Sequence, residues 1–141
     1  MTKTVDIEGE VAQMKFLEGR SRLSDTTGVF ARLGEYRGDS MISAGGFSGT
    51  SQWERHPNGE EIVQIIKGST KVTLLTEDGT EEHLLKAGMF IIVPQNTWHQ
   101  FNAPDGVTLM TTTPQPTEHI EDEYPPDMKL PLSGQGQRGA G

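Results

Sequence analysis

Short apolar segments separated by turn signals recur along most of this sequence, and this alternation constrains the fold more than any other feature. The turn signals combine Gly, Pro, Asn or Asp, and they fall at Asn58-Gly59, Glu77-Asp78-Gly79-Thr80, Ala87-Gly88 and Pro104-Asp105-Gly106. The segments between them, such as 62–67 and 89–93, are rich in β-branched and other apolar residues. Short strands at this spacing are typical of a β-sandwich or a small barrel. The sequence therefore predicts an all-β fold.

The individual strands follow from the same pattern. We expect them at residues 11–17, 29–36, 41–47, 52–56, 62–67, 70–76, 81–86, 89–93, 98–101 and 107–113. Gly68 separates two of them, and Pro94 ends the most apolar one because proline cannot donate to a sheet ladder. We expect residues 1–9 to be frayed and the Gly/Gln-rich end of the chain to be disordered.

Composition narrows the class of protein further. A length of 141 residues fits one domain, and 17 glycines with 8 prolines favour many turns over a helix bundle. The net charge of −8 argues against nucleic acid and against an anionic membrane surface as partners, since both carry phosphates. The absence of cysteine excludes disulfides, thiolate ligands and a cysteine nucleophile. Residues 1–15 hold no apolar signal-peptide core, and no segment is long enough to span a bilayer, so we expect a soluble cytoplasmic protein.

Two carboxylates and two histidines stand out as candidate site residues. Glu54 and His56 are two residues apart in an expected strand, so their side chains point to the same face. Glu61 lies just beyond the turn at 57–59 and can fold back toward them, while His99 comes from a later strand. Closure of a barrel could gather these four side chains around one metal ion or one small substrate.

The spacing of these residues resembles the two sequence motifs of the cupins, a family of small β-barrels. The first cupin motif reads Gly, five residues, His-x-His, three or four residues, Glu, six residues and Gly, and the matching residues here are Gly49, Glu54, His56, Glu61 and Gly68, with Glu54 one residue closer to the glycine than in the motif. The second reads Gly, five residues, Pro-x-Gly, two residues, His, three residues and Asn, and the matching residues here are Gly88, Pro94, Asn96, His99 and Asn102, with Asn102 one residue early. The match covers roughly residues 41–113 and implies the cupin double-stranded β-helix, a jelly-roll barrel.

The resemblance also implies a division of the chain. Residues 41–115 would form the barrel core, and residues 1–40 would supply N-terminal strands that extend the barrel or a dimer interface. Residues 116–141 would form an acidic and Gly-rich tail that is partly disordered. Cupins often form homodimers in which an N-terminal strand completes the partner's sheet, so we expect a homodimer.

Glu54 is the departure from the cupin motif that matters most, because it stands where the family places its first histidine. By resemblance, the metal ligands are Glu54, His56, Glu61 and His99, and Glu54 carries over only as a chemical substitute. Two carboxylates and two imidazoles suit a divalent Mn, Fe, Ni or Zn ion better than Cu. Asn96 replaces a motif glycine, which is tolerable because asparagine also accepts a left-handed backbone.

Glu54 has two further interpretations. Without metal, Glu54 and Glu61 would repel each other, which would raise the pKa of one carboxyl group and provide a general acid or base. Glu54 is therefore the candidate catalytic residue, as a carboxylate that carries a proton without binding the metal. Alternatively, Glu54 marks a barrel that has lost its metal.

Taken with the resemblance, these residues predict a small metal-binding cupin that binds or acts on a small organic molecule in its barrel. If the protein is an enzyme, dioxygenation is expected, or isomerase or lyase chemistry through a metal-stabilised enolate. The alternatives are a non-catalytic cupin that binds a small ligand without metal, and a structural protein with a vestigial pocket. Phe101 and Met110 are candidates to line a pocket, whereas Glu60 and His83 are expected in solvent. His119 could cover the barrel mouth, but a solvated loop is expected.

Overall fold

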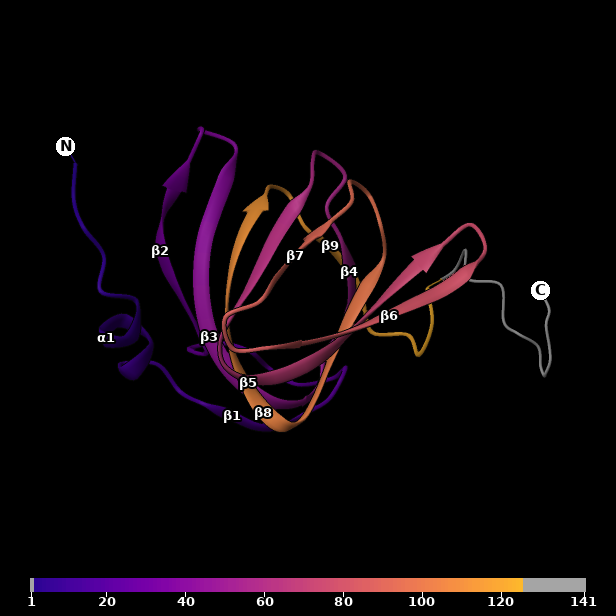
Figure 1. Cartoon of the computed structure of the whole chain (residues 1–141), viewed down its shortest axis with the longest axis horizontal. Coiled ribbons are helices and arrows are strands. Elements are labelled where there is room, and N and C mark those ends of the chain that lie inside the picture. Colours follow the sequence, from indigo (N-terminus) through magenta and orange to yellow (C-terminus); the bar gives the residue numbers. More distant parts are fainter. Residues whose placement is uncertain (1, 126–141) are drawn as a thin grey trace.

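The computed structural model of the chain describes residues 2–125, and within that range it contains one short helix and nine strands. They are α1 (Ile7–Ala12), β1 (Leu17–Arg20), β2 (Phe30–Tyr36), β3 (Ser40–Thr50), β4 (Trp53–Arg55), β5 (Glu61–Thr76), β6 (Gly79–Lys86), β7 (Phe90–Val93), β8 (His99–Pro114) and β9 (Glu118–Ile120). All nine strands belong to one sheet, which curls into an open barrel (Figure 1). The all-β jelly-roll expectation is confirmed. No helix in this part of the chain has the length and apolar character to cross a membrane.

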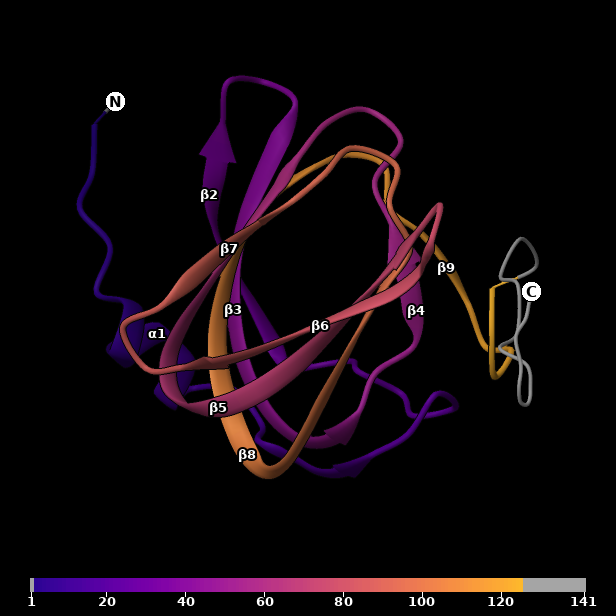
Figure 2. The same ribbon diagram turned by 45° about the vertical axis from the view of Figure 1, so that its right-hand side comes forward.

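β8 is the central strand of the curled sheet. It pairs antiparallel with β3, β4 and β5, while β3 also pairs with β1 and β2, and β5 also pairs with β6 and β7. β9 pairs with the other edge of β4. The short β4 is therefore held in the barrel wall between two strands that come much later in the chain (Figure 2).

The sequence predicts two strand breaks that the structure does not contain. This prediction is wrong, because β5 and β8 are each continuous 16-residue strands. The predicted breaks at Gly68 and at residues 104–106 are bulges, and the register between β5 and β8 shifts between Gly68 and Lys71. Gly68 has a φ of 74°, and a Cβ there would lie 2.3 Å from the carbonyl oxygen of Gly106. Glycine at this position lets the two backbones approach closely without ending either strand.

The prediction of a strand at residues 11–17 is also wrong, since this part of the chain contains the end of α1 and the start of β1. Asp6 caps the helix by accepting a hydrogen bond from the Gly9 N–H at 3.1 Å. Ile7 and Val11 lie at helical spacing and pack against buried residues of β2 and β3. The chain is therefore held on the barrel from Ile7 onward, where fraying was expected.

Part of the expected C-terminal tail lies against the barrel. β9 pairs with β4, and Trp53 Nε1 donates a hydrogen bond to the Glu123 carbonyl oxygen at 2.9 Å. The disorder that was expected farther along falls on residues 126–141, which lie outside the described residues.

The main hydrophobic core fills part of the barrel interior. It comprises Phe47, Val63, Ile65, Val72, Leu74, Leu85, Val93, Phe101, Ala103, Val107 and Leu109. Along β5, the buried Val63 and Ile65 alternate with the exposed Ile62 and Gln64, as expected for a strand with one face in the core. The same curled sheet buries a group of polar side chains beside this core.

Candidate metal centre

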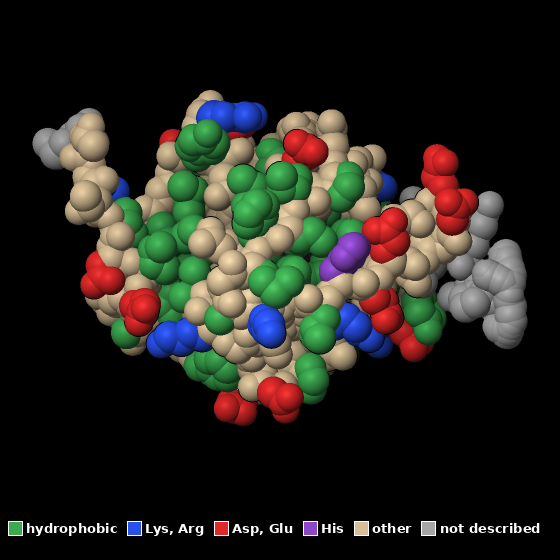
Figure 3. Space-filling view, viewed as in Figure 1, with side chains coloured by type: hydrophobic (Ala, Val, Ile, Leu, Met, Phe, Trp, Pro, Cys, Tyr) green, Lys and Arg blue, Asp and Glu red, His purple; other side chains and the backbone are tan. Residues whose placement is uncertain are grey.

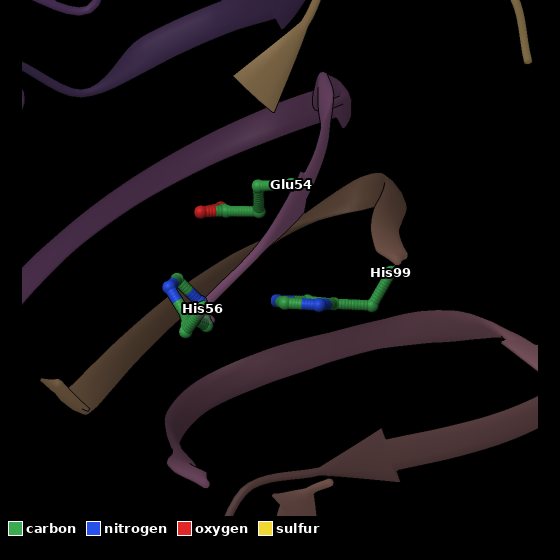
Figure 4. A group of neighbouring side chains, drawn as sticks. All are labelled: Glu54, His56 and His99. Atoms are coloured by element: carbon green, nitrogen blue, oxygen red, sulfur yellow. The ribbon is translucent and has the colours of Figure 1, made fainter. Parts of the chain in front are cut away.

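β4 places Glu54 opposite two histidines. The register pairs Glu54 with His99 of β8 on one side and with His119 of β9 on the other. Residues paired directly across antiparallel strands project their side chains from the same face of the sheet. His56 follows Glu54 by two residues and projects from that face as well. Figure 4 shows the side chains of Glu54, His56 and His99 gathered in one space, with the strand that carries Glu54 beside the one that carries His99.

The ligand atoms of Glu54, His56 and His99 lie within 4.8 Å of one another, so this group could hold one metal ion. Glu61, the first residue of β5, lies among them. Its Oε1 is 3.2 Å from His56 Nε2 and 3.1 Å from His99 Nε2. His56, Glu61 and His99 are 2%, 3% and 0% exposed, and Glu54 is half-buried. The structure thus brings together all four residues that were singled out from the sequence.

Contacts on the far side of His56, Glu61 and His99 orient these three groups. His99 Nδ1 lies 2.9 Å from the Thr97 carbonyl oxygen, which can only accept, so this nitrogen must donate. His56 Nδ1 lies 3.1 Å from Thr117 Oγ1, and Thr113 Oγ1 donates to Glu61 Oε2 at 2.6 Å. Contacts of this kind fix the ring tautomers of metal-binding histidines and leave Nε2 directed at the ion.

The charges of the group perturb one another strongly. Burial would raise the pKa of Glu61, but the adjacent imidazoles of His56 and His99 outweigh it and lower this pKa to about 2. Burial would lower the pKa of His99, but the hydrogen bond to Glu61 and the carboxylate charges raise it to about 9. The pKa of Glu54 is raised, first by burial and then by the charge of Glu61. The expected repulsion between the two carboxylates therefore raises the pKa of Glu54 and not that of Glu61.

The buried nitrogen of His56 provides a test of whether a metal fits this site. His56 Nε2 has no hydrogen-bond partner among residues 2–125, although it lies close to Glu61 Oε1. Buried polar atoms are nearly always satisfied, so a buried imidazole nitrogen without a hydrogen-bond partner, beside a carboxylate and a second imidazole, is suited to bind a cation. Two nitrogen and two carboxylate ligands suit a divalent ion such as Mn, Fe, Ni or Zn. The residues present fit a divalent metal.

A cavity of about 290 Å³ opens beside this group. Glu54 and Glu61 lie in its lining, and Phe47 and Phe101 contribute apolar surface. The expectation that Phe101 lines a pocket is therefore confirmed. Met110 packs instead against the small cluster of Ala31, Leu33 and Ala44.

Sequence reasoning missed several residues of the cavity, among them Arg20, Thr113 and Thr117. His119 was expected in a solvated loop, and although its side chain is exposed it lines the cavity from β9. Its position, directly after a threonine and glutamate in an acidic segment, carries no local signal of a strand. Glu60 and His83 are exposed, as expected.

The backbone of the second motif also agrees with expectation. Asn96 has a φ of 59°, the left-handed conformation that was expected where cupins have glycine. Asn102 lies at the other edge of the motif, where its Oδ1 accepts a hydrogen bond from Thr50 Oγ1 at 3.0 Å. Asn96 therefore adopts the backbone conformation that the motif glycine would supply.

A curated protein is similar to this chain in sequence. A protein of Acanthamoeba polyphaga mimivirus is 31% identical over 85 residues, which are 59% of this chain and 51% of that protein. The chain thus spans about half the length of this curated relative.

Solved structures resemble this fold at low sequence identity. A cupin-2 domain protein of Shewanella frigidimarina has a TM-score of 0.54 at 18% identity, covering 66% of this chain and 86% of that one. A hydroquinone 1,2-dioxygenase in complex with Cd²⁺ and 4-hydroxybenzonitrile has a TM-score of 0.51 at 17% identity, covering 60% and 63%. Oxalate decarboxylase of Bacillus subtilis, with Mn(II) centres, has a TM-score of 0.53 at 14% identity, covering 58% and 24%. These likenesses show the fold.

The sequence pattern of the cupin domain matches residues 41–112, which is about half of the chain. This segment contains both motifs, all four residues of the candidate metal centre and most of the barrel strands. The chain belongs to the cupin family.

Proposed function

We propose that this protein binds one divalent metal ion through Glu54, His56, Glu61 and His99, and that it acts on a small organic molecule in the adjacent cavity. The observation that carries the proposal is the buried, unpartnered Nε2 of His56, which faces Glu61 together with His99 Nε2. A divalent cation would satisfy this nitrogen and would balance the charge of the two carboxylates.

The metal would act as a Lewis acid toward an oxygen atom of the substrate. If Glu54 is left out of the ligand set, it would be placed to hold and transfer a proton, because it is half-buried, lines the cavity and has a raised pKa in the absence of metal. Phe47 and Phe101 would keep water from the apolar part of the substrate. The similar folds include a manganese-containing oxalate decarboxylase and a hydroquinone dioxygenase, which supports metal-assisted chemistry on a small oxygen-bearing molecule. Dioxygenation and isomerase or lyase chemistry are both consistent with this arrangement.

A second function, ligand binding without metal, is favoured by one observation. Glu61 already has hydrogen bonds at both carboxylate oxygens, with Thr113 at one and His99 at the other. The raised pKa of His99 lets one proton bridge His99 and Glu61 in place of a metal. A metal-free barrel could therefore persist as a small-molecule-binding protein.

Elemental analysis of the purified protein separates the two functions. We expect about one divalent metal ion per chain, and we expect His99→Ala to lose it because His99 supplies one of four ligands. His83→Ala is the matched control, since His83 is exposed and lies outside the site. A metal content near zero in the wild type, or an equal content in the wild type and His99→Ala, would contradict the proposal. Thermal stabilisation of the metal-free protein by small molecules would then support the second function.

We also propose that the protein forms a homodimer. Exposed apolar side chains gather on one face of the sheet, where Ile62 of β5 pairs with Ile92 of β7 and Phe90 lies nearby. Figure 3 shows hydrophobic side chains near the middle of the face in view, with acidic ones mostly toward its edges. Sedimentation at the dimer mass is expected, and Phe90→Glu should shift it toward the monomer if this face is the interface.

A further inference from the structure

Arg20 is a cationic side chain that the metal chemistry leaves without a role. It projects from β1 into the cavity lining that also contains Glu54 and Glu61. Within residues 2–125, its guanidinium contacts aromatic rings and has no hydrogen-bond or ion-pair partner. Arginine carries five N–H donors and stays charged, so these donors are open to whatever occupies the cavity.

A close backbone contact sets the position of Arg20. β1 runs parallel to β3 with Arg20 beside Gly49, the first glycine of the cupin motif. Gly49 has a φ of 100°, and a Cβ at this residue would lie 2.3 Å from the Arg20 carbonyl oxygen. Only glycine therefore lets β1 come close enough to deliver Arg20 to the cavity.

Two aromatic rings then orient the guanidinium. Its Cζ lies 4.6 Å from the centre of the Phe47 ring and 5.6 Å from the centre of the Phe30 ring. Stacking on ring faces stabilises the cation and leaves the N–H edge of the guanidinium unused. Burial lowers the pKa of Arg20, and the charge of Glu54 opposes that shift. A half-buried, oriented cation with free donors indicates an anionic ligand, because buried charges are normally paired.

The charge balance of the site indicates which anion. A divalent ion would be neutralised by Glu54 and Glu61, and Arg20 then leaves a charge of +1 for the ligand to balance. A phosphate, which carries nearly two charges at neutral pH, would exceed this balance, whereas a monocarboxylate matches it. The flat fork of a guanidinium also pairs with a carboxylate through two parallel hydrogen bonds.

We propose that Arg20 binds the carboxylate of a small monoanionic ligand whose apolar or aromatic body lies against Phe47 and Phe101. A cavity of about 290 Å³ with aromatic side chains in its lining has room for a single ring. The inference rests on the proposed function for the position of the ligand beside the metal, but recognition of the carboxylate by Arg20 does not itself require the metal.

Calorimetric titration of benzoate and of its neutral analogue benzamide tests this assignment. Both ligands are titrated into the metal-loaded protein and into chelator-treated protein, with metal content measured in each sample. We expect benzoate to bind about 10- to 100-fold more tightly than benzamide, the effect of hydrogen bonds to a charged group. Arg20→Gln should remove this preference and leave the metal content unchanged. Arg20→Lys, which keeps the charge, should retain part of it.

Arg32→Gln is the matched control, because Arg32 is exposed on β2 and the substitution makes the same change in net charge. It should leave the benzoate preference intact. Equal affinity for benzoate and benzamide, no binding of either, or unchanged benzoate affinity in Arg20→Gln would overturn the assignment. If Arg20→Gln does not fold, the assignment is decided by the relative affinities of benzoate and benzamide for the wild type and for Arg20→Lys. A protein that takes up no metal in the loading step but still prefers benzoate would refute the metal centre and retain the role of Arg20.

Discussion

Replacement of Thr113 by valine tests how the buried carboxylate of Glu61 is held. Thr113 Oγ1 donates to Glu61 Oε2 at 2.6 Å, and the two residues are 7% and 3% exposed. A short hydrogen bond to a buried charge contributes about 1.5–3 kcal/mol to stability. Valine has nearly the shape of threonine, so the change removes the hydrogen bond and leaves no cavity.

We expect the metal-free Thr113→Val protein to lose about 1.5–3 kcal/mol of unfolding free energy. For a domain of this size, at about 3–4 °C per kcal/mol, the melting temperature would fall by about 5–12 °C. Metal affinity should also fall, by about 10- to 100-fold, because a carboxylate without its outer partner is held less firmly. Urea unfolding of chelator-treated protein and competition with a chromophoric chelator measure the two effects.

Two controls accompany this experiment. Thr113→Ser keeps the hydroxyl group and should keep metal affinity near that of the wild type. Thr112→Val changes the neighbouring residue, which faces the other side of β8, and should alter stability by no more than about 0.5 kcal/mol. If Thr113→Val unfolds at the same urea concentration as the wild type and binds metal equally well, then Glu61 is not held as the structure describes.

Three other predictions follow from the same geometry. In the metal-free protein, the stabilisation from His99, whose pKa rises from 6.5 to about 9, is complete below about pH 6.5 and is lost as pH rises through 9. The stabilisation from Glu61, whose pKa falls from 4.5 to about 2, is present above about pH 4.5 and is lost as pH falls through 2. Urea unfolding should therefore show maximal stability between about pH 4.5 and pH 6.5. A stability profile that does not decline from pH 6.5 to 9 contradicts the coupling between His99 and Glu61. Glu54→Gln should raise the melting temperature of the metal-free protein at pH 7, since burial and Glu61 disfavour the charged carboxylate, and should lower metal content. Gly68→Ala should cost at least about 2 kcal/mol of unfolding free energy, because the residue has a φ of 74° and its Cβ would meet the Gly106 carbonyl; unfolding at wild-type urea concentration would refute the bulge.

The convergence of the four site residues could be predicted from the sequence because local rules and motif spacing agree. Strand alternation places Glu54 and His56 on one face, and the turn that follows returns Glu61 toward them. The left-handed backbone at Asn96 could be predicted because few residues other than glycine tolerate it. These features depend on short stretches of chain.

Features that depend on long-range pairing could not be predicted in this way. Gly68 gives the same sequence signal for a turn as for a bulge, and only the approach of β8 distinguishes them. Arg20 reaches the cavity through parallel pairing of β1 with β3, which leaves no local pattern. The α1 helix did have a signal, in Asp6 as a cap and in the spacing of Ile7 and Val11, but it lies in a region too short to stand out from its polar surroundings.

The three-residue strand β4, which carries Glu54, depends on the end of the described chain for its outer neighbour. β9 pairs with β4 along its whole length, and Glu118 forms an ion pair with Arg55 at 2.7 Å. Truncation of the chain before residue 118 would therefore remove β9 and leave β4 without its outer pairing partner, although all four candidate metal ligands would remain. Residues 118–120 also offer a position at which the substrate range could be changed, because His119 lines the cavity and is not one of the four candidate metal ligands.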